Sequence, residues 1–190
     1  MSLNLDILDQ EIKLETDRLI LRKPYEKDIQ DVFEYGSDEE VTKYVRFKTH
    51  KNLTDAKTFL VIAKNGFKNK TALTLVIELR RENKVIGAID FKDIDDLSEK
   101  AELGFILSRK YWSKGFMSEA CRKFIEFGFK KIKLNRIEAH VDIENIRSIK
   151  LLKDIMQKEG MLRECEKKNG KYINMNLYSI LKREYILRKV

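Results

Sequence analysis

The chain has 190 residues, of which 37% are charged, and its formal net charge is +8. This length suits one domain with a substantial core, so we expect a single domain over residues 1–190. The sequence holds no run of about 18 apolar residues, which a membrane span needs, and its acidic, apolar start is unlike a secretory signal. We therefore expect a cytoplasmic protein without membrane contact.

The positive charge gathers in one part of the chain. Between Arg109 and Arg136 there are nine Lys or Arg residues and two Glu residues. A basic surface is typical of proteins that bind nucleic acid, a membrane surface or an anionic small ligand. The interleaving of basic and aromatic residues found on RNA-binding surfaces is absent, so we expect an anionic small ligand and no nucleic-acid partner. A basic nucleic-acid-binding module stays open as an alternative, and it predicts salt-dependent affinity for DNA or RNA.

The first 70 residues predict one strand and three helices. Apolar residues alternate over residues 16–23, which predicts a strand that ends at Pro24. Apolar residues then recur at helical spacing near residues 29–33, 41–44 and 56–67. The candidate N-cap residues of these helices are Asp28, Ser37 or Asp38, and Thr54.

From residue 73 the apolar pattern changes to alternation, and strands predominate. The expected strands lie at residues 73–79, 85–91, 101–107, 137–141, 161–167 and 172–181. Residues 93–100 read as a polar turn, and Asn169-Gly170 splits the last hairpin. One helix with a wide apolar stripe follows Gly115, and another begins at Asn145. The order predicts an α/β (α+β) fold, with a mostly antiparallel central sheet of about six or seven strands flanked by helices.

The turn before the first of these two helices is typical of an anion-binding site. The first N–H groups of a helix have no partner within it, and the helix dipole places positive charge at that end. Gly115 lets a ligand approach the backbone closely, while Arg109, Lys110 and Lys114 add positive charge nearby. The spacing matches neither a P-loop nor the three-glycine dinucleotide-binding motif. We therefore expect a nucleotide-derived cofactor.

Five separated motifs resemble the GNAT acetyltransferase superfamily, and specifically its RimJ/RimL branch of ribosomal-protein N-terminal acetyltransferases. The resemblance covers nearly the whole chain, and the motifs occur in the family's order. They are TDRLILR at 16–22, VIGAI at 85–89, AELGF at 101–105 together with WSKGFMSEA at 112–120, NIRS at 145–148 and YSIL at 178–181.

The resemblance implies acetyl-CoA as co-substrate and assigns its contacts. The pantetheine arm would lie along Phe105, Ile106 and Leu107, near a strand bulge. Asn145 would hold the pantetheine amide, and Ser148 would lie near the thioester sulfur. The pyrophosphate would accept hydrogen bonds from the backbone of Trp112, Ser113, Lys114, Gly115, Phe116 and Met117.

The chain departs from the family pattern at four places. Met117 stands where Gly or Ala is usual, and Ser113 stands where the branch commonly has glycine. About four residues within Met156 to Glu159 appear as an insertion, which predicts that the preceding helix is one turn longer. An often acidic position in the last hairpin is Asn174. The backbone donors of the turn are unaffected, so we expect cofactor binding to be retained.

Two residues are candidates for the chemistry of direct acetyl transfer. Glu102 lies next to the expected pantetheine strand and could accept the amine proton directly or through water. The alternative is a solvated strand carboxylate. Ser148 could protonate the departing thiolate, and its alternative role is helix capping.

Other conspicuous side chains have plainer interpretations. His50 and His140 lack companion ligands, so we expect structural or solvent-facing roles. The two cysteines, Cys121 and Cys165, fit no metal spacing, and we expect structural thiols and no metal site. Trp112 flanks the turn and can serve packing alone. Three aromatic residues of the early helices fit either the family's acceptor groove or the core: Tyr35, Tyr44 and Phe47.

The main hypothesis is an acetyl-CoA-dependent N-acetyltransferase that acts by direct transfer to a primary amine. A protein or peptide N-terminus is the favoured acceptor through the resemblance alone. One alternative is acetylation of a small amine such as a polyamine, an amino acid or an antibiotic. Another is a non-catalytic acyl-CoA-binding regulator. A homodimer is a possible assembly.

Overall fold

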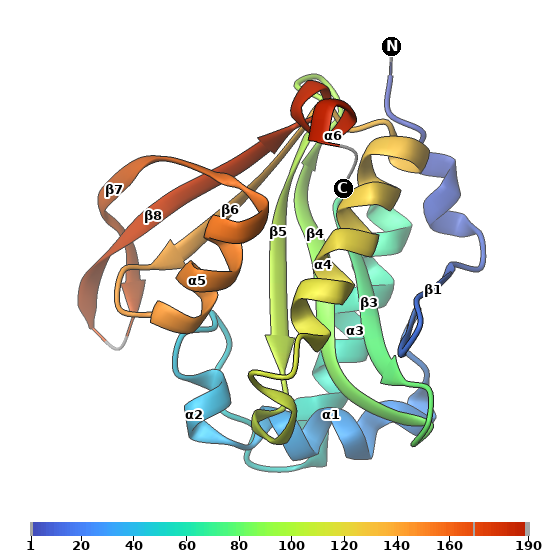
Figure 1. Cartoon of the computed structure of the whole chain (residues 1–190). Coiled ribbons are helices and arrows are strands. Elements are labelled where there is room, and N and C mark those ends of the chain that lie inside the picture. Colours follow the sequence, from blue (N-terminus) through green and yellow to red (C-terminus); the bar gives the residue numbers. More distant parts are fainter. Residues whose placement is uncertain (1, 169, 189–190) are drawn as a thin grey trace.

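The computed structural model describes residues 2–168 and 170–188, and within them a single eight-stranded sheet carries helices on both faces (Figure 1). The strand order is β1-β2-β3-β4-β5-β6-β8-β7, and neighbouring strands are antiparallel except β5 and β6. The strands are β1 (Lys13–Glu15), β2 (Leu19–Arg22), β3 (Leu73–Leu79), β4 (Lys84–Asp95), β5 (Lys100–Leu107), β6 (Arg136–Asp142), β7 (Gln157–Lys168) and β8 (Lys171–Leu181).

The helices divide between the two faces of the sheet. They are α1 (Ile29–Gly36), α2 (Glu39–Thr42), α3 (Leu53–Asn69), α4 (Phe116–Phe127), α5 (Ile146–Ile155) and α6 (Lys182–Arg188), with short helical turns η1 (Leu5–Asp9), η2 (Glu26–Asp28), η3 (Arg109–Tyr111) and η4 (Gly128–Ile132). The main apolar core lies between the sheet and α4, and a smaller one joins α1 and α3 to the other face. In the part of the chain that is described, no helix combines the length and apolar character needed to cross a membrane.

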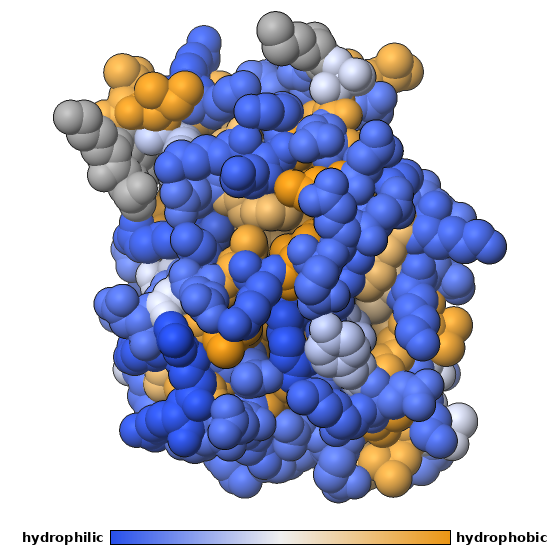
Figure 2. Space-filling model, turned by 90° about the vertical axis from the view of Figure 1, so that its right-hand side faces the viewer, coloured by the Kyte–Doolittle hydropathy of each residue, from blue (hydrophilic) through white to orange (hydrophobic). Residues whose placement is uncertain are grey.

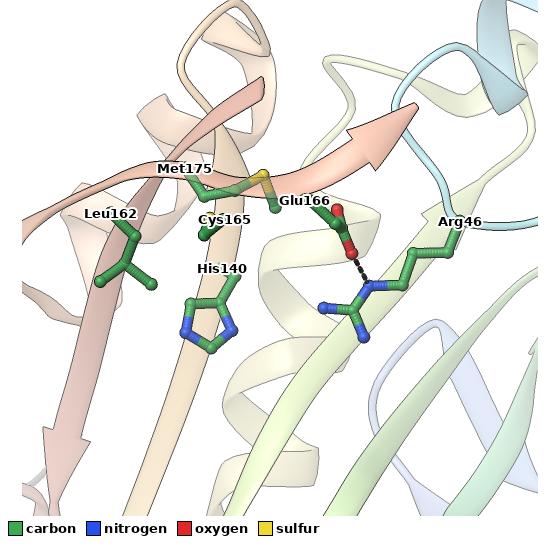
Figure 3. Close-up of a pocket in the computed structure, with 6 residues that line it drawn as sticks. All are labelled: Arg46, His140, Leu162, Cys165, Glu166 and Met175. Carbon is green, nitrogen blue, oxygen red and sulfur yellow. Dashed lines mark ion pairs between the residues drawn. The ribbon is translucent and has the colours of Figure 1, made fainter. Parts of the chain in front are cut away.

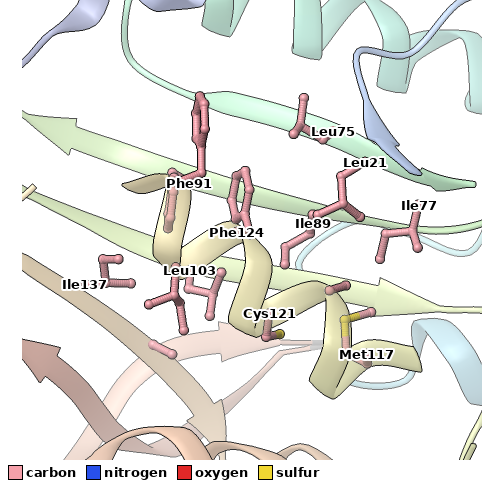
Figure 4. Packing of buried hydrophobic residues seen from close by; sticks show 14 of the residues in the cluster. Leu21, Leu75, Ile77, Ile89, Phe91, Leu103, Met117, Cys121, Phe124 and Ile137 are labelled. Atoms are coloured by element: carbon pink, nitrogen blue, oxygen red, sulfur yellow. The ribbon is translucent and has the colours of Figure 1, made fainter. Parts of the chain in front are cut away.

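The larger core follows from the alternation of apolar residues along the central strands. Phe91 of β4 stacks on Phe124 of α4, with ring centroids 4.1 Å apart (Figure 4). Cys121 lies in the same core and is fully buried, as expected for a structural thiol. Because these side chains are removed from water, the hydrophobic effect fixes α4 against β4 and β5. The outer face seen in Figure 2 is mostly hydrophilic.

The predicted elements are mostly present, with differences at their ends. β1 and α6 were not expected, and β1 brings the sheet to eight strands, slightly above the expected six or seven. The expected polar turn shortens, because β4 continues to Asp95. Asn52, and not Thr54, caps α3: its Oδ1 accepts a hydrogen bond from the backbone of Asp55 at 3.1 Å. Asp28 does not cap α1: its carboxylate accepts a hydrogen bond from the backbone N–H of Tyr25 in the capping box of η2, at 2.7 Å, and pairs with Arg22, also at 2.7 Å.

The predicted extra turn of helix over Met156 to Glu159 is wrong. Helix α5 ends at Ile155, Met156 is extended, and β7 begins at Gln157. The register of β7 against β8 shifts between Lys158 and Gly160, so the strand pairing absorbs the irregularity. The turn expected at Asn169 lies outside the described residues.

Candidate active site

The strands β5 and β6 separate where the expected pantetheine stretch begins. They pair over three positions only, the last being Glu102 with Glu138. Beyond Glu102, β5 stays paired with β4 alone, which leaves its other edge without a strand partner over Phe105 to Leu107. Unpaired strand edges bind extended amide-containing ligands through backbone hydrogen bonds. The pairing with β4 is regular from Glu102 to Leu107, so the bulge implied by the resemblance is absent from this stretch.

The turn after β5 presents an uncapped helix N-terminus. Gly115 is the N-cap of α4 with φ of 79°, and no side chain caps the first turn. A Cβ atom at Gly115 would meet only Arg18 Nη2, at 3.4 Å, so the space in front of the backbone is open. Ser113 also adopts a left-handed conformation, with φ of 58°, at the position where the family commonly has glycine. Free N–H groups beside open space fit a phosphate group.

A cluster of polar contacts anchors this turn to the start of the sheet. Arg18 Nε donates to Glu119 Oε2 at 2.6 Å, and Arg18 Nη1 donates to the carbonyl oxygen of Lys114 at 3.0 Å. The Thr16 hydroxyl donates to Glu119 Oε1 at 2.6 Å. Burial favours a higher pKa for Glu119, but these hydrogen bonds outweigh it and lower the pKa. Sequence reasoning gave neither Arg18 nor Glu119 a role, although both lie within the recognised motifs.

The basic residues around the turn differ in whether a carboxylate already neutralises their charge. Arg109 pairs with Asp38 at 2.9 Å, and Lys110 pairs with Glu34 at 2.6 Å. Lys114 has no carboxylate partner in the described ranges, and its ammonium lies 5.6 Å from the centre of a tyrosine ring. Lys114 is therefore the residue best placed to offer uncompensated charge to an anion.

The start of helix α5 lies beside the same turn. The Trp112 indole N–H donates to the carbonyl oxygen of Leu107 at 2.7 Å, and the Arg147 guanidinium lies 4.6 Å from the indole ring. Asn145 Oδ1 accepts a hydrogen bond from the backbone of Ser148 at 3.2 Å, which caps the helix. The cap uses the Ser148 N–H and leaves its half-buried hydroxyl without a partner among the described residues. The hydroxyl is therefore available for a ligand.

Glu102 lies in a charged cluster on the opposite face of the sheet from α4. Its side chain is 8% exposed and meets Lys92 Nζ at 2.8 Å, His140 Nδ1 at 3.1 Å and Arg46 Nη2 at 3.7 Å. Burial favours a higher pKa, but hydrogen bonds from His140 and Lys92 outweigh it and lower the pKa of Glu102 to about 2. Glu102 is thus a buried, paired anion and not a solvated strand carboxylate, and its low pKa makes it a weak base.

His140 was expected to be structural or solvent-facing, and it is a half-buried partner of Glu102. The hydrogen bond to Glu102 raises the pKa of His140. Its ring lines a pocket of about 110 Å³ (Figure 3). The other lining residues are Arg46, Leu162, Cys165, Glu166 and Met175. The alternation along β6 correctly predicted that His140 points away from the core. The sequence held no signal that Glu102 is its partner.

Polar contacts join the segment after α2 to strand β7, and one of them lies in the lining of the pocket. Arg46 forms an ion pair with Glu166, and Lys168 Nζ donates to the carbonyl oxygens of Lys43 and, at 2.9 Å, Val45. Cys165 is an exposed thiol here, in contrast to the buried structural role expected for it. No group of three metal-ligating side chains forms within residues 2–168 and 170–188.

The remaining candidates are not among the residues that line this pocket. Tyr35 is buried in the α1 core, so it takes the packing role that was its alternative. Phe47 is partly exposed, with its ring 5.1 Å from that of His50. Asn174 accepts a hydrogen bond from the backbone of Glu164 at 2.8 Å, which gives it a structural role in the hairpin.

Known proteins are similar to this chain both in sequence and in fold. The family model described as "Acetyltransferase (GNAT) domain" matches residues 18–156. An uncharacterized N-acetyltransferase p20 of Bacillus licheniformis is 41% identical over 173 residues, which is 90% of this chain and 97% of that protein. The crystal structure of a GNAT-family acetyltransferase from Bacillus anthracis superposes with a TM-score of 0.81, at 29% identity, over 91% of this chain and 100% of that one.

More distant relatives have named acceptors. A ribosomal-protein-serine acetyltransferase of Escherichia coli is 29% identical over 52% of this chain and 56% of that protein, in agreement with the RimJ/RimL branch. A spermidine N(1)-acetyltransferase of Vibrio cholerae is 27% identical over 60% of this chain and 65% of that protein. Sequence, fold and the geometry of the turn agree: this chain belongs to the GNAT acetyltransferase family and is an N-acetyltransferase with acetyl-CoA as its co-substrate.

Proposed function

We propose that the edge of β5 left unpaired where β5 and β6 separate holds the pantetheine arm of acetyl-CoA, and that the turn before α4 holds its pyrophosphate. The observation that carries this proposal is the position of the uncapped N-terminus at Gly115 directly after a strand with a free edge. In this arrangement Phe105, Ile106 and Leu107 offer backbone groups to the arm. The phosphates accept hydrogen bonds from the backbone of Trp112, Ser113, Lys114, Gly115, Phe116 and Met117.

The helix that begins at Asn145 completes the cofactor site. The side-chain amide of Asn145 faces a ligand with its N–H donors, because its oxygen is already used in the cap. Ser148 lies one turn further on and carries the free hydroxyl, so we assign it the proton donor role toward the departing thiolate. A thiol with a pKa of about 8.5 needs little help to leave, so this role is a modest one.

The proposed acceptor is the α-amino group of a protein or peptide. An α-amine has a pKa of about 8, so part of it is neutral at cellular pH, whereas a lysine amine at about 10.4 is almost wholly protonated. The ribosomal-protein-serine acetyltransferase relative supports this class. Direct transfer in a ternary complex needs no enzyme nucleophile, which agrees with the burial of Cys121.

A slender small amine is the second candidate, and one observation favours it. Arg46 and Glu166, which both line the pocket, form an ion pair, and the pocket is small, at about 110 Å³. The spermidine N(1)-acetyltransferase relative supports this alternative.

The test begins with calorimetric titration of acetyl-CoA into the purified protein and into a Gly115→Ala variant. We expect micromolar or tighter binding to the wild type and at least tenfold weaker binding to the variant, since the added methyl group occupies the approach of the phosphates. Gly170→Ala is the matched control, because Gly170 has the same left-handed backbone, with φ of 82°, and lies in open space. Equal binding by both variants would remove the cofactor from this turn.

Turnover is then measured with peptides that begin with Ser or Ala and with spermidine. Acetylation of the peptides alone supports the N-terminal acceptor, and acetylation of spermidine alone supports the small-amine alternative. Tight acetyl-CoA binding without transfer to any amine would favour the non-catalytic regulator.

A further inference from the structure

A second carboxylate lies on the sheet face that carries Glu102, and the acetyl-transfer scheme above does not use it. Asp90 of β4 pairs with Gly104 of β5, and it is half-buried. A Cβ atom built on Gly104 would lie 2.2 Å from Asp90 Oδ1. The carboxylate therefore lies flat against the backbone of β5, in space that only glycine leaves open.

This position is the point where the two central strands separate. The last pair that joins β5 to β6 is at Glu102, Gly104 is two residues further along, and the proposed pantetheine stretch begins at Phe105. Side chains two residues apart on a strand share one face, so Asp90, opposite Gly104, lies on the same face as Glu102 and Ile106. Asp90 thus lies beside the start of the proposed pantetheine stretch, and the following inference rests on the proposed function.

The surroundings of Asp90 differ from those of Glu102. The charged groups that face Asp90 are Lys92 of β4, Glu102 of β5 and Arg46 from the segment after α2, while its partner on β3 is the uncharged Thr74. Both cations are engaged with other carboxylates: Lys92 and Arg46 contact Glu102, and Arg46 also pairs with Glu166. Asp90 is left without an ion pair of its own in the described part of the chain.

The two carboxylates consequently have very different proton affinities. Burial raises the pKa of Asp90 to about 6, with the nearby charge of Glu102 adding to the effect and Lys92 opposing it. The pKa of Glu102 is lowered to about 2 by its hydrogen bonds. A pair of carboxylates whose pKa values are pushed apart separates into a group that exchanges protons and a group that stays charged.

We propose that Asp90 is the proton acceptor for the incoming amine, directly or through one water, and that Glu102 is the fixed anion that holds His140, Lys92 and Arg46 in place. In this step the acceptor ammonium gives one proton to the Asp90 carboxylate, and the neutral amine forms a C–N bond to the acetyl carbonyl carbon. The C–S bond then breaks, the departing thiolate takes a proton from the Ser148 hydroxyl, Ser148 recovers one by taking the second amine proton, and Asp90 returns its proton to solvent.

The test compares the pH dependence of kcat/KM in four proteins, with spermidine and a Ser-initiated peptide as acceptors. Wild type is expected to lose activity as the pH falls below about 6, because Asp90 becomes protonated. The isosteric Asp90→Asn variant is expected to lose this acidic limb and about 100-fold or more in kcat/KM, with acetyl-CoA affinity within threefold of wild type. Glu102→Gln is expected to keep the limb. Asp93→Asn, an exposed site on the same strand, is expected to match wild type throughout.

An acidic limb that persists in Asp90→Asn, with kcat/KM reduced less than threefold, would overturn the assignment. If wild type fails to bind acetyl-CoA, the proposed function and this inference both fail. If wild type binds acetyl-CoA but acetylates neither probe, the acceptor class is wrong, and Asp90 is judged by its ¹³Cγ NMR titration in the complex. A midpoint near pH 6 supports the inference, and one near the ordinary value of about 4 overturns it.

Discussion

Replacement of Glu102 by Gln gives the sharpest test of the charged cluster on the sheet. Glu102 is 8% exposed and contacts three cationic side chains. Its pKa falls from the ordinary 4.5 to about 2, and about 2.5 pKa units correspond to about 3 kcal/mol of stabilisation of the charged form. Glutamine keeps the shape but not the charge. We therefore expect Glu102→Gln to lower the free energy of unfolding by about 2–3 kcal/mol at pH 7.

The pH dependence of this loss distinguishes charge from packing. A carboxylate with a lowered folded pKa contributes stability above its unfolded pKa of 4.5, and this contribution disappears as the pH falls through about 2. The difference between wild type and Glu102→Gln should therefore be constant above pH 5 and shrink to about 1 kcal/mol at pH 3. Urea denaturation followed by far-UV circular dichroism measures both values.

A matched control separates burial from simple charge pairing. Glu126 on α4 also contacts two lysines, Lys130 at 2.6 Å and Lys123 at 3.6 Å, but its side chain is 34% exposed. We expect Glu126→Gln to cost about 0.5 kcal/mol or less, because water screens surface pairs. Equal losses for the two variants, or a loss for Glu102→Gln that does not change between pH 7 and pH 3, would refute the reasoning.

Three further predictions concern the phosphate turn and His140. Ser113→Gly should raise the free energy of unfolding by about 0.5–1 kcal/mol in urea denaturation, because glycine adopts the left-handed backbone conformation of residue 113 without steric strain. A loss of stability would contradict the positive φ at this residue. Arg18→Ala should lower the free energy of unfolding by about 1 kcal/mol. It should also weaken acetyl-CoA binding several-fold in calorimetry, since the Lys114 carbonyl loses its hydrogen-bond donor. Unchanged affinity would show that the turn keeps its conformation without Arg18. The raised pKa of His140 contributes stability that is present below its unfolded pKa of about 6.5 and is lost as the pH rises through its folded pKa. His140→Asn should therefore destabilise the protein more at pH 5.5 than at pH 9, and equal losses would exclude the ion pair with Glu102.

The elements that depend on local patterns were predictable from the sequence. Strands β3, β5 and β6 follow from alternation, and α4 follows from a wide apolar stripe after Gly115. These patterns are local because each side chain's direction is set by the backbone of its own element. The same locality explains why an anion-binding turn could be predicted: a glycine at a helix start is a property of a few consecutive residues.

The ends of elements and the acceptor side needed the tertiary structure. The end of α5 at Ile155 is decided by the pairing of β7 with β8, which takes Gln157 out of the helix. Glu102, Asp90 and His140 belong to three different strands, and only their alignment in the sheet brings a histidine against one carboxylate and leaves the other without an ion pair among the described residues. The sequence by itself determined which faces are apolar and where an anion is expected to bind, because those are properties of single elements. The tertiary structure alone decided which charges meet, because a pKa depends on neighbours that are distant along the chain.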